Sequence, residues 1–508
     1  MRAWTRVAII VAALVAAALV APATPAAAGI GSEPRLIEES DIVRLEAHRL
    51  YILNPFRGLQ VVDVADVDHP QMLGGAPVLG HPMEMYVRDA VAFVTASEVG
   101  TSEEGTPFGN IQAIDVRDPS RPVVLGAFRV DGFVTDSRIV GDVLYAVANR
   151  YAWYDYFGNT DRESTTVLSV NLAEPRAPHE VERIRFLGLA TRIHATQDLL
   201  YVAQPNRDDA NPETRITFVD IHDPVGAIHA VGEVTVRGIV TNKFQLFQAE
   251  GALRVVSHEG GLGTSGTQRL TVVDPADPTQ PRVVSELSLP RTGGLWATRM
   301  DGDRVYLVTL VRVDAPVLHA IDASDPWEPV LMSSLELPGL LRLVLPRGDR
   351  LLALGTDHGT RADLTLSTFD VTGPPVPLDR VPVGPDGAYS PALWDDRAFA
   401  LSEGLGLALI PYAFPSGRDP CQGPSCPHGR ASGLALVDVN LASGDLTPRG
   451  RADQAGTVQR AIPTPGLPNR VLSLSERTLQ TIDIANRDHP VVTAVLSLAR
   501  DVSDFPHP

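Results

Sequence analysis

A repeated motif runs through the whole chain and constrains its fold more than any other sequence feature. An apolar residue is followed by Asp, or once by Asn, with a second acid commonly three residues later and a proline commonly seven residues later. The first polar residue of the motif occurs nine times, at spacings of 45 to 68 residues: Asp63, Asp115, Asn171, Asp220, Asp274, Asp322, Asp370, Asp438 and Asp483. Repeats of this length are typical of arrays in which each unit packs against its neighbours.

The motif predicts the end of one strand, a turn and the start of the next strand. The second acid, such as Asp66, can accept hydrogen bonds from backbone amides two residues further on and so close the turn. The proline, such as Pro70, has no N–H and suits a turn or the first residue of a strand. Each unit also carries an earlier apolar strand, such as residues 143–147, with another short strand before it. The pattern gives four strands per unit and no helical period.

Four short strands per unit predict an all-β fold, a single large β-propeller with four-stranded blades. The Gly and Pro counts, 42 each, agree with so many turns. A β-solenoid would have shorter repeats, and separate β-sandwiches would be joined by linkers. The repeats give nine units, and propellers typically have about four to eight blades. We therefore expect nine blades, or eight if the first and last units share one.

Residues 1–28 have the pattern of a cleaved signal peptide. Arg2 and Arg6 precede an apolar run from Val7 to Val20, and three alanines end at Ala28. The run is too short to span a bilayer, although an uncleaved anchor is the alternative. No cysteine lies nearby, which excludes a lipid anchor, and no later stretch predicts a transmembrane segment. We expect residues 29–508 to form the propeller and to be secreted or periplasmic in a bacterium.

The two cysteines, Cys421 and Cys426, lie in one Gly- and Pro-rich stretch. In an oxidising compartment this spacing predicts a local disulfide. The rival interpretation adds His428 as a third zinc ligand, but three ligands are too few for a closed structural site. We predict the disulfide and no metal site.

The charge of the chain opposes nucleic-acid binding. Lys plus Arg number 43 and Asp plus Glu number 61, for a net charge of −18. Even so, a basic residue recurs near the first strand of most units, and the chain's only lysine is one of them: Arg44, Arg138, Arg192, Lys243, Arg299, Arg342 and Arg460. If this basic set faces the ring axis, it would bind a carboxylate, phosphate or sulfate. The alternative is that each basic residue pairs with an acid of its own or a neighbouring blade, such as Glu84, Asp136 or Asp301.

Insertions fall repeatedly between the second and third strands of a unit, which places them on one face of the ring. Such a face commonly builds a binding surface. The insertion 150–164 is rich in aromatic residues, among them Trp153, Tyr154, Tyr156 and Phe157. Aromatic side chains suit carbohydrate or protein partners, although an inward-folded cluster is the alternative. We expect this aromatic loop and the basic set to lie at opposite ends of the channel.

The order of several strand motifs resembles a known family. Residues 40–44 with 50–53, then 236–242 with 251–256, and then 299–309 are similar to the secreted bacterial proteins with a β-propeller domain distantly related to WD-40 repeats. The likeness covers most of the chain, with departures such as Lys243, where the family has Gln. It implies a propeller and a secreted location. It implies no reaction, because members of the family are largely uncharacterised.

The sequence lacks a recognised catalytic motif. It has no Gly-x-Ser-x-Gly elbow, no His-Glu-x-x-His pair and no phosphate-binding loop. The acidic turn 63–68 suggests calcium as a minor alternative to having no cofactor. We predict a non-enzymatic, monomeric binding or scaffold protein whose loop-rich face takes a protein or a cell-surface glycan. The alternatives are a hydrolase with its site at the channel mouth and a structural envelope protein.

Overall fold

The computed structural model describes residues 35, 37–38, 40–101, 107–151, 163–190, 192–206, 211–260, 266–289, 293–312, 315–357, 363–414 and 432–499. Residues Met1–Arg35 separate from Leu36–Pro508, the unit that contains all of the strands. The predicted signal peptide, residues 1–28, therefore lies outside the described residues.

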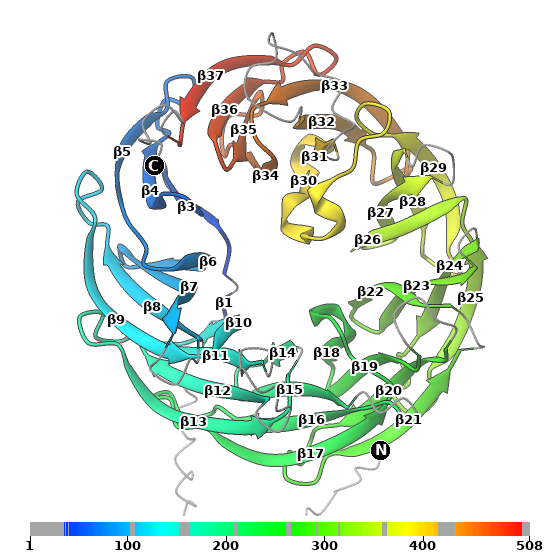
Figure 1. Cartoon of the computed structure of the whole chain (residues 1–508). Helices are drawn as coiled ribbons and strands as arrows, with labels where there is room; N and C mark the ends of the chain where they lie inside the picture. Colours follow the sequence, from blue (N-terminus) through cyan, green and yellow to red (C-terminus); the bar gives the residue numbers. More distant parts are fainter. Residues whose placement is uncertain are drawn as a thin grey trace, which may run out of the picture. The chain divides into compact units, whose positions relative to one another are not determined.

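Nine antiparallel sheets follow one another along the chain, and each has four consecutive strands (Figure 1). Blade 1 contains β2 (Val43–Glu46), β3 (Arg49–Asn54), β4 (Gly58–Asp63) and β5 (Gln71–Ala76). Blade 2 contains β6 (His81–Arg88), β7 (Val91–Thr101), β8 (Pro107–Asp115) and β9 (Val123–Asp131). Blade 3 contains β10 (Phe133–Val140), β11 (Val143–Arg150), β12 (Ser164–Asn171) and β13 (His179–Leu187), with β1 (Ile37–Glu38) added to its inner edge.

The next three blades repeat the same order. Blade 4 contains β14 (Arg192–Ala195), β15 (Leu199–Asn206), β16 (Glu213–Asp220) and β17 (His229–Arg237). Blade 5 contains β18 (Leu246–Ala249), β19 (Ala252–His258), β20 (Gln268–Asp274) and β21 (Arg282–Ser288). Blade 6 contains β22 (Leu295–Asp301), β23 (Arg304–Arg312), β24 (Ala315–Asp322) and β25 (Val330–Glu336).

The last three blades complete the ring. Blade 7 contains β26 (Gly339–Arg347), β27 (Arg350–Asp357), β28 (Leu364–Asp370) and β29 (Val376–Pro382). Blade 8 contains β30 (Ala400–Ser402), β31 (Leu407–Ala413), β32 (Ser432–Val439) and β33 (Leu446–Gln454). Blade 9 contains β34 (Val458–Pro463), β35 (Arg470–Ser475), β36 (Thr478–Asp483) and β37 (Val491–Ser497). The short 3-10 turns are η3 (Lys243–Gln245), η4 (Pro391–Leu393), η5 (Asp396–Ala398) and η6 (Glu403–Leu405).

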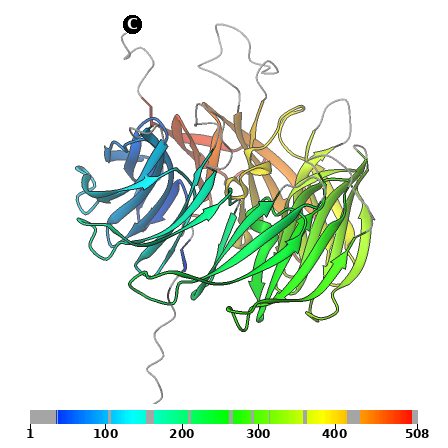
Figure 2. The same ribbon diagram turned by 60° about the horizontal axis from the view of Figure 1, so that its bottom comes forward.

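This arrangement confirms the all-β propeller and settles the number of blades at nine. The first strand of each blade lies nearest the ring axis and the fourth lies at the rim (Figure 1). Figure 2 shows the same blades from the side, each as a twisted sheet next to its neighbour. Blades 1 and 9 each have four strands of their own, so the alternative of eight blades with one shared is excluded.

The repeated motif forms a double turn after the third strand. The Asp63 carboxylate accepts a hydrogen bond from the Ala65 N–H at 2.8 Å, and the Asp66 carboxylate accepts one from the Asp68 N–H at 3.1 Å. The second bond recurs in other blades, at Asp118, Glu174, Asp223, Asp277 and Asp325. The predicted role of the second acid is therefore confirmed. Pro70 precedes the outer strand β5, where an N–H would have no ladder partner.

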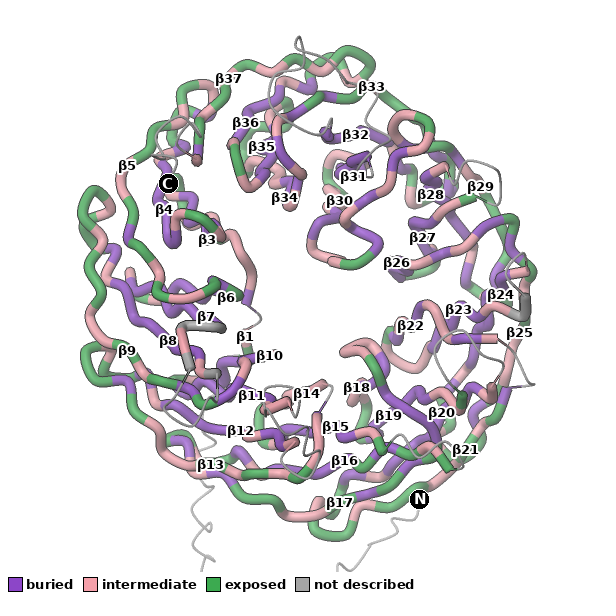
Figure 3. Tube along the Cα trace, viewed as in Figure 1, coloured by how far each residue is buried: buried purple, intermediate pink, exposed green. Residues whose placement is uncertain are grey.

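The core is divided among the blade interfaces. Nine buried hydrophobic clusters occur, one between each pair of neighbouring blades. Figure 3 shows the buried segments concentrated in the two middle strands of each blade, while the outer strands mix exposed and intermediate residues. The middle strands read as continuous apolar runs because both of their faces are covered by neighbouring blades.

The ring closes between blades 9 and 1 without exchanging a strand. Leu50 and Ile52 of β3 pack with Leu472 and Leu474 of β35 in a cluster like those of the other interfaces. Polar contacts seal the same junction. Arg470 Nε lies 2.8 Å from the Asp68 carboxylate, and other bonds are made by Asn54, Gln60 and Thr481.

Strand direction defines two faces of the ring. Because the strands of a blade alternate in direction, the connections between second and third strands and those between blades share one face, hereafter the loop face. The connections between first and second strands and between third and fourth strands share the other, hereafter the turn face. The described strands that flank the expected insertions begin and end on the loop face. No helix of the described segments has the length and apolarity of a membrane span.

Candidate functional site

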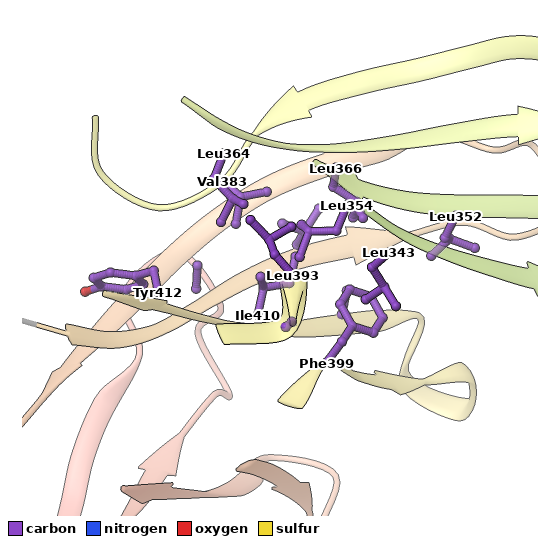
Figure 4. Close-up of a cluster of buried hydrophobic side chains, with 14 of the residues drawn as sticks. Leu343, Leu352, Leu354, Leu364, Leu366, Val383, Leu393, Phe399, Ile410 and Tyr412 are labelled. Carbon is purple, nitrogen blue, oxygen red and sulfur yellow. The ribbon is translucent and has the colours of Figure 1, made fainter. Parts of the chain in front are cut away.

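The connection between blades 7 and 8 departs from the repeat and extends toward the ring axis (Figure 1). We call residues 383–399 the axial insert. Ser390 caps η4, with Pro391 in its first turn, and the Asp395 side chain caps η5. Leu393 and Phe399 point into the buried cluster between the two blades, beside residues such as Leu354 (Figure 4). These anchors fix both ends of the stretch 394–398, which lies on the inner side of the two blades.

Asp395 of the axial insert binds Arg460 of blade 9. Arg460 Nη1 donates to the Asp395 carboxylate at 2.7 Å, and Arg460 Nη2 donates to the Asp41 carboxylate, also at 2.7 Å. Only 6% of the Arg460 side chain is exposed. Asp41 belongs to the N-terminal segment, so one buried guanidinium joins that segment to the axial insert.

Asp396 reaches blades 5 and 6, which are not the blades that the axial insert connects. Its carboxylate lies 3.2 Å from Lys243 Nζ, in the connection to blade 5, and 3.9 Å from Arg299 Nη1 in blade 6. The Arg299 guanidinium also stacks over the Phe244 ring, 4.3 Å from its centroid. These ion pairs therefore join the axial insert to blades beyond the two that it connects.

Trp394 covers Arg342 of blade 7. The Arg342 guanidinium lies 4.4 Å from the Trp296 ring centroid and 5.5 Å from the Trp394 ring centroid. Burial lowers the Arg342 pKa, as expected for a cation with aromatic neighbours in place of water. Tyr389 meets Trp394 edge to face, with centroids 5.7 Å apart. Trp394 remains 67% exposed, so this stack presents an aromatic surface to solvent.

The axial insert thus contacts four of the seven residues of the basic set: Lys243, Arg299, Arg342 and Arg460. The alternative expected from the sequence is that a basic residue pairs with an acid of its own blade or of a neighbouring blade. Arg138 forms such a pair, because its Nη1 lies 2.6 Å from Asp136. The exposed Arg44 forms another, 3.6 Å from Glu46.

The basic set does not lie at one level. Arg44, Arg138 and Arg299 each pair across the ladder with a tyrosine of the second strand, whereas His194 holds that register in blade 4. Arg192 lies two residues earlier, and Lys243 lies in η3 before its strand. The basic residues therefore occupy different depths along the axis.

In blade 2 the register position of Arg138 is held by Tyr86, which pairs with Phe93, and Glu84 lies two residues before it. The Glu84 carboxylate accepts a hydrogen bond from the Ser137 hydroxyl at 2.9 Å. Burial, and then the neighbouring Asp136, raise the Glu84 pKa. The Glu84 carboxyl, whose ionised form is disfavoured, therefore lies close to the ion pair between Arg138 and Asp136.

One cavity brings together three of the basic residues. This inner cavity, of about 310 Å³, lies among the inner strands of blades 3 to 6. Arg138, Lys243 and Arg299 line it together with Asp396 and His194. Most of its remaining lining is apolar: Ile37, Ile193, Ala195, Phe244, Leu246, Phe247 and Met300.

A second cavity, of about 550 Å³, opens on the loop face between blades 3 and 4. We call it the outer cavity, and its lining includes Tyr151, Glu163, Asn149 and Arg192. Tyr151 begins the predicted aromatic loop, while its residues Trp153, Tyr154, Tyr156 and Phe157 lie outside the described residues. Arg192 lines the same cavity as Tyr151, so the expectation that the loop and the basic set lie at opposite ends is wrong for this residue.

Other predicted sites have less support. Cys421, Cys426 and the rival ligand His428 lie outside the described residues. Within the described ranges, no group of three or more His, Cys, Asp or Glu side chains is placed to hold a metal ion. In the acidic turn 63–68, Asp68 binds Arg470, which lowers the Asp68 pKa.

A hydrolase would need convergent acids, or a histidine with an acid, at the channel mouth. Asp395 and Asp396 lie there, but each contacts a cation. Two close histidine–acid pairs, His69 with Asp66 and His222 with Asp198, lie in exposed turns on the turn face.

Sequence reasoning missed the stretch Trp394-Asp395-Asp396. The available signals were the absence of a basic residue in the eighth unit and the 68-residue spacing between Asp370 and Asp438, the longest of the series. The sequence pattern alone could not show that Asp395 and Asp396 contact the cations that other units contribute.

Comparison with known sequences identifies the architecture. A sequence model of the family described as "Beta propeller domain" matches residues 35–164 and 155–461. An uncharacterised protein of Methanocaldococcus jannaschii is 27% identical over 180 residues, which make up 35% of this chain and 28% of that protein. The chain therefore spans under a third of the length of that relative.

Solved structures show distant likeness. Sqt1 of Saccharomyces cerevisiae is 9% identical, with a TM-score of 0.38, over 79% of this chain and 94% of that one. The β-propeller domain of the Trilobed protease from Pyrococcus furiosus is 13% identical, with a TM-score of 0.35, over 71% and 97%. A candidate 6-phosphogluconolactonase from Bacteroides fragilis is 13% identical, with a TM-score of 0.37, over 66% and 89%. At these TM-scores none of them carries an argument about function.

Proposed function

Because the chain belongs to the β-propeller domain family, we propose that it is a non-enzymatic binding protein whose loop face takes a glycan. The observation that carries the proposal is the stack of Trp296, Arg342 and Trp394. An exposed indole backed by a guanidinium is a rigid, flat surface on which a sugar ring can lie. The proposed location outside the cytoplasm rests on the leader pattern of residues 1–28.

The topology puts the stack on the loop face. Trp394 belongs to a connection between blades, and Trp296 lies near the start of the first strand β22. Tyr389 bridges to Ala413, the last residue of the second strand β31. All of these positions are on the loop face because antiparallel strands begin and end there.

The outer cavity supports the same proposal. It also opens on the loop face, and it combines the Tyr151 ring with carboxylate, amide and guanidinium groups from Glu163, Asn149 and Arg192. Aromatic walls with a few hydrogen-bonding groups suit a polar ligand with flat faces. A glycan of several sugars, rather than a single one, fits a face that offers two separate contact areas.

The test is binding of cellotetraose, chitotetraose and maltotetraose, measured by tryptophan fluorescence and calorimetry. We expect Trp394→Ala to weaken binding of the recognised sugar by about tenfold or more, because the main stacking surface is removed. The matched control is Trp327→Ala, since Trp327 is 62% exposed but lies in a turn of the turn face. Equal loss in both variants, or binding of none of the sugars, would contradict the proposal.

A further inference from the structure

We propose that the inner cavity binds a small organic anion with an apolar body, and that Asp396 competes with this anion for Lys243 and Arg299. This site lies among the inner strands and is separate from the glycan surface on the loop face. Its ligand class follows from the lining, the charges and the strength of the contacts that Asp396 makes.

The lining of the inner cavity has two characters. Three cationic side chains, Arg138, Lys243 and Arg299, contribute to one cavity of about 310 Å³. The other walls are mainly aliphatic or aromatic, as in most small-molecule sites. A bare inorganic ion would leave those apolar walls facing water. The lining therefore selects a molecule with an anionic head and an apolar body.

Among the described residues, two carboxylates contact the three cations directly. Asp136 binds Arg138, and Asp396 contacts both Lys243 and Arg299. Glu84 is partly buried nearby, where desolvation and the charge of Asp136 raise its pKa and so disfavour its ionised form. If Asp396 moves aside, Lys243 and Arg299 face the cavity with one fewer negative charge. A carboxylate or phosphate head would replace the aspartate.

The contacts of Asp396 are weak enough for such an exchange. Its distances to Lys243 and Arg299 are 3.2 and 3.9 Å, and all three side chains keep more than a fifth of their surface exposed. At 3.9 Å the contact with Arg299 is too long for a hydrogen bond. The neighbouring pair of Asp395 with Arg460 is shorter, at 2.7 Å, and Arg460 is buried. Asp395 thus anchors the axial insert while Asp396 can be displaced.

The experiment is calorimetric titration of the folded protein with phenylpropionate, phenyl phosphate and the neutral amide phenylpropionamide. We expect at least one of the two anions to bind and the amide to bind at least tenfold more weakly, because it has no charge for Lys243 and Arg299. Lys243→Met and Arg299→Met should each weaken binding of that anion by about tenfold. The matched control is Arg44→Met, because Arg44 belongs to the basic set but does not line the inner cavity.

The decisive variant is Asp396→Asn. Removing the internal competitor should tighten anion binding by about fivefold or more, a gain that a misfolded variant could not give. Weaker or unchanged binding in Asp396→Asn would overturn the proposal. Equal affinity for the amide would do the same, as would inorganic phosphate binding as tightly as the organic anions. Loss of sugar binding with intact anion binding would reject only the glycan site.

Discussion

His319 illustrates how single buried polar residues are accommodated between the strands. Both ring nitrogens are within hydrogen-bond distance of a hydroxyl, Thr309 at 2.9 Å and Ser334 at 2.8 Å. Only 3% of the residue is exposed, and burial lowers its pKa to about 4. A neutral imidazole with two partners fits this place in blade 6, whereas a protonated one would lack its solvation.

This environment predicts acid sensitivity. The unfolded chain binds a proton at His319 near pH 6.5, and the folded protein does so only near pH 4. Stability should therefore fall as pH decreases through this window, by about 2 to 3 kcal/mol from His319 alone. Urea unfolding of the wild type and His319→Gln at about pH 7 and about pH 4.5 measures this difference. An equal loss in both proteins would exclude His319 as the cause.

At this scale the sequence predicted the turns well. The acids of the motif act within two residues of themselves, so their hydrogen bonds depend on local chain geometry. The partners of Arg460 could not be read in the same way. Asp41 and Asp395 lie 419 and 65 residues away, and only the closed ring brings them together.

Among the elements, two irregular segments tie the inner rim of the ring. The N-terminal segment pairs β1 with blade 3, bridges Asp41 to Met85 of blade 2 and then enters blade 1. The axial insert reaches from blade 8 to blades 5, 6, 7 and 9. Both meet at Arg460, which is therefore the point where the two ties are joined.

Arg460→Met should destabilise the protein by about 2 to 4 kcal/mol, because it leaves two acids without their shared cation. Thermal and urea unfolding measure the change. Arg44→Met is the control, since Arg44 is exposed and its single ion pair contributes little. Equal stability of the two variants would show that the inner rim is not held at Arg460.

The elements differ in how far sequence could predict them. The nine units were countable because each repeats one apolar run and one turn. The axial insert has no counterpart in the other units, so no repeat pattern could place it. The repeat pattern also could not show that the basic residues lie at different depths along the axis. A 3-10 turn at Lys243 shifts that residue relative to its equivalents in other blades.

At the scale of the whole molecule, blades 9 and 1 share no strand. The junction that closes the ring is therefore held by side-chain packing and polar side-chain contacts, without strand pairing. The cluster joining blades 9 and 1 is built like the other eight, from the middle strands of both neighbours. We expect no weak point there, because its apolar residues are as fully buried as those elsewhere.

Leu472→Ala at the closing junction and Leu354→Ala between blades 7 and 8 should therefore cost similar amounts, about 2 to 5 kcal/mol each. Both side chains are almost fully buried. Urea unfolding gives the two values, and hydrogen exchange shows which strands open. Early exchange in β3 and β35 of the Leu472 variant alone would instead mark the junction as the weakest interface.

Because every blade is complete, one repeat can also be gained or lost as a unit in evolution. Each blade starts and ends within its own stretch of chain, so a gene duplication or deletion between equivalent points adds or removes one whole blade. The four strands of every other blade would keep their partners, and the ring would adjust the angle between neighbours. Nine blades can therefore be one member of a series of ring sizes, reached by copying units without a new folding solution.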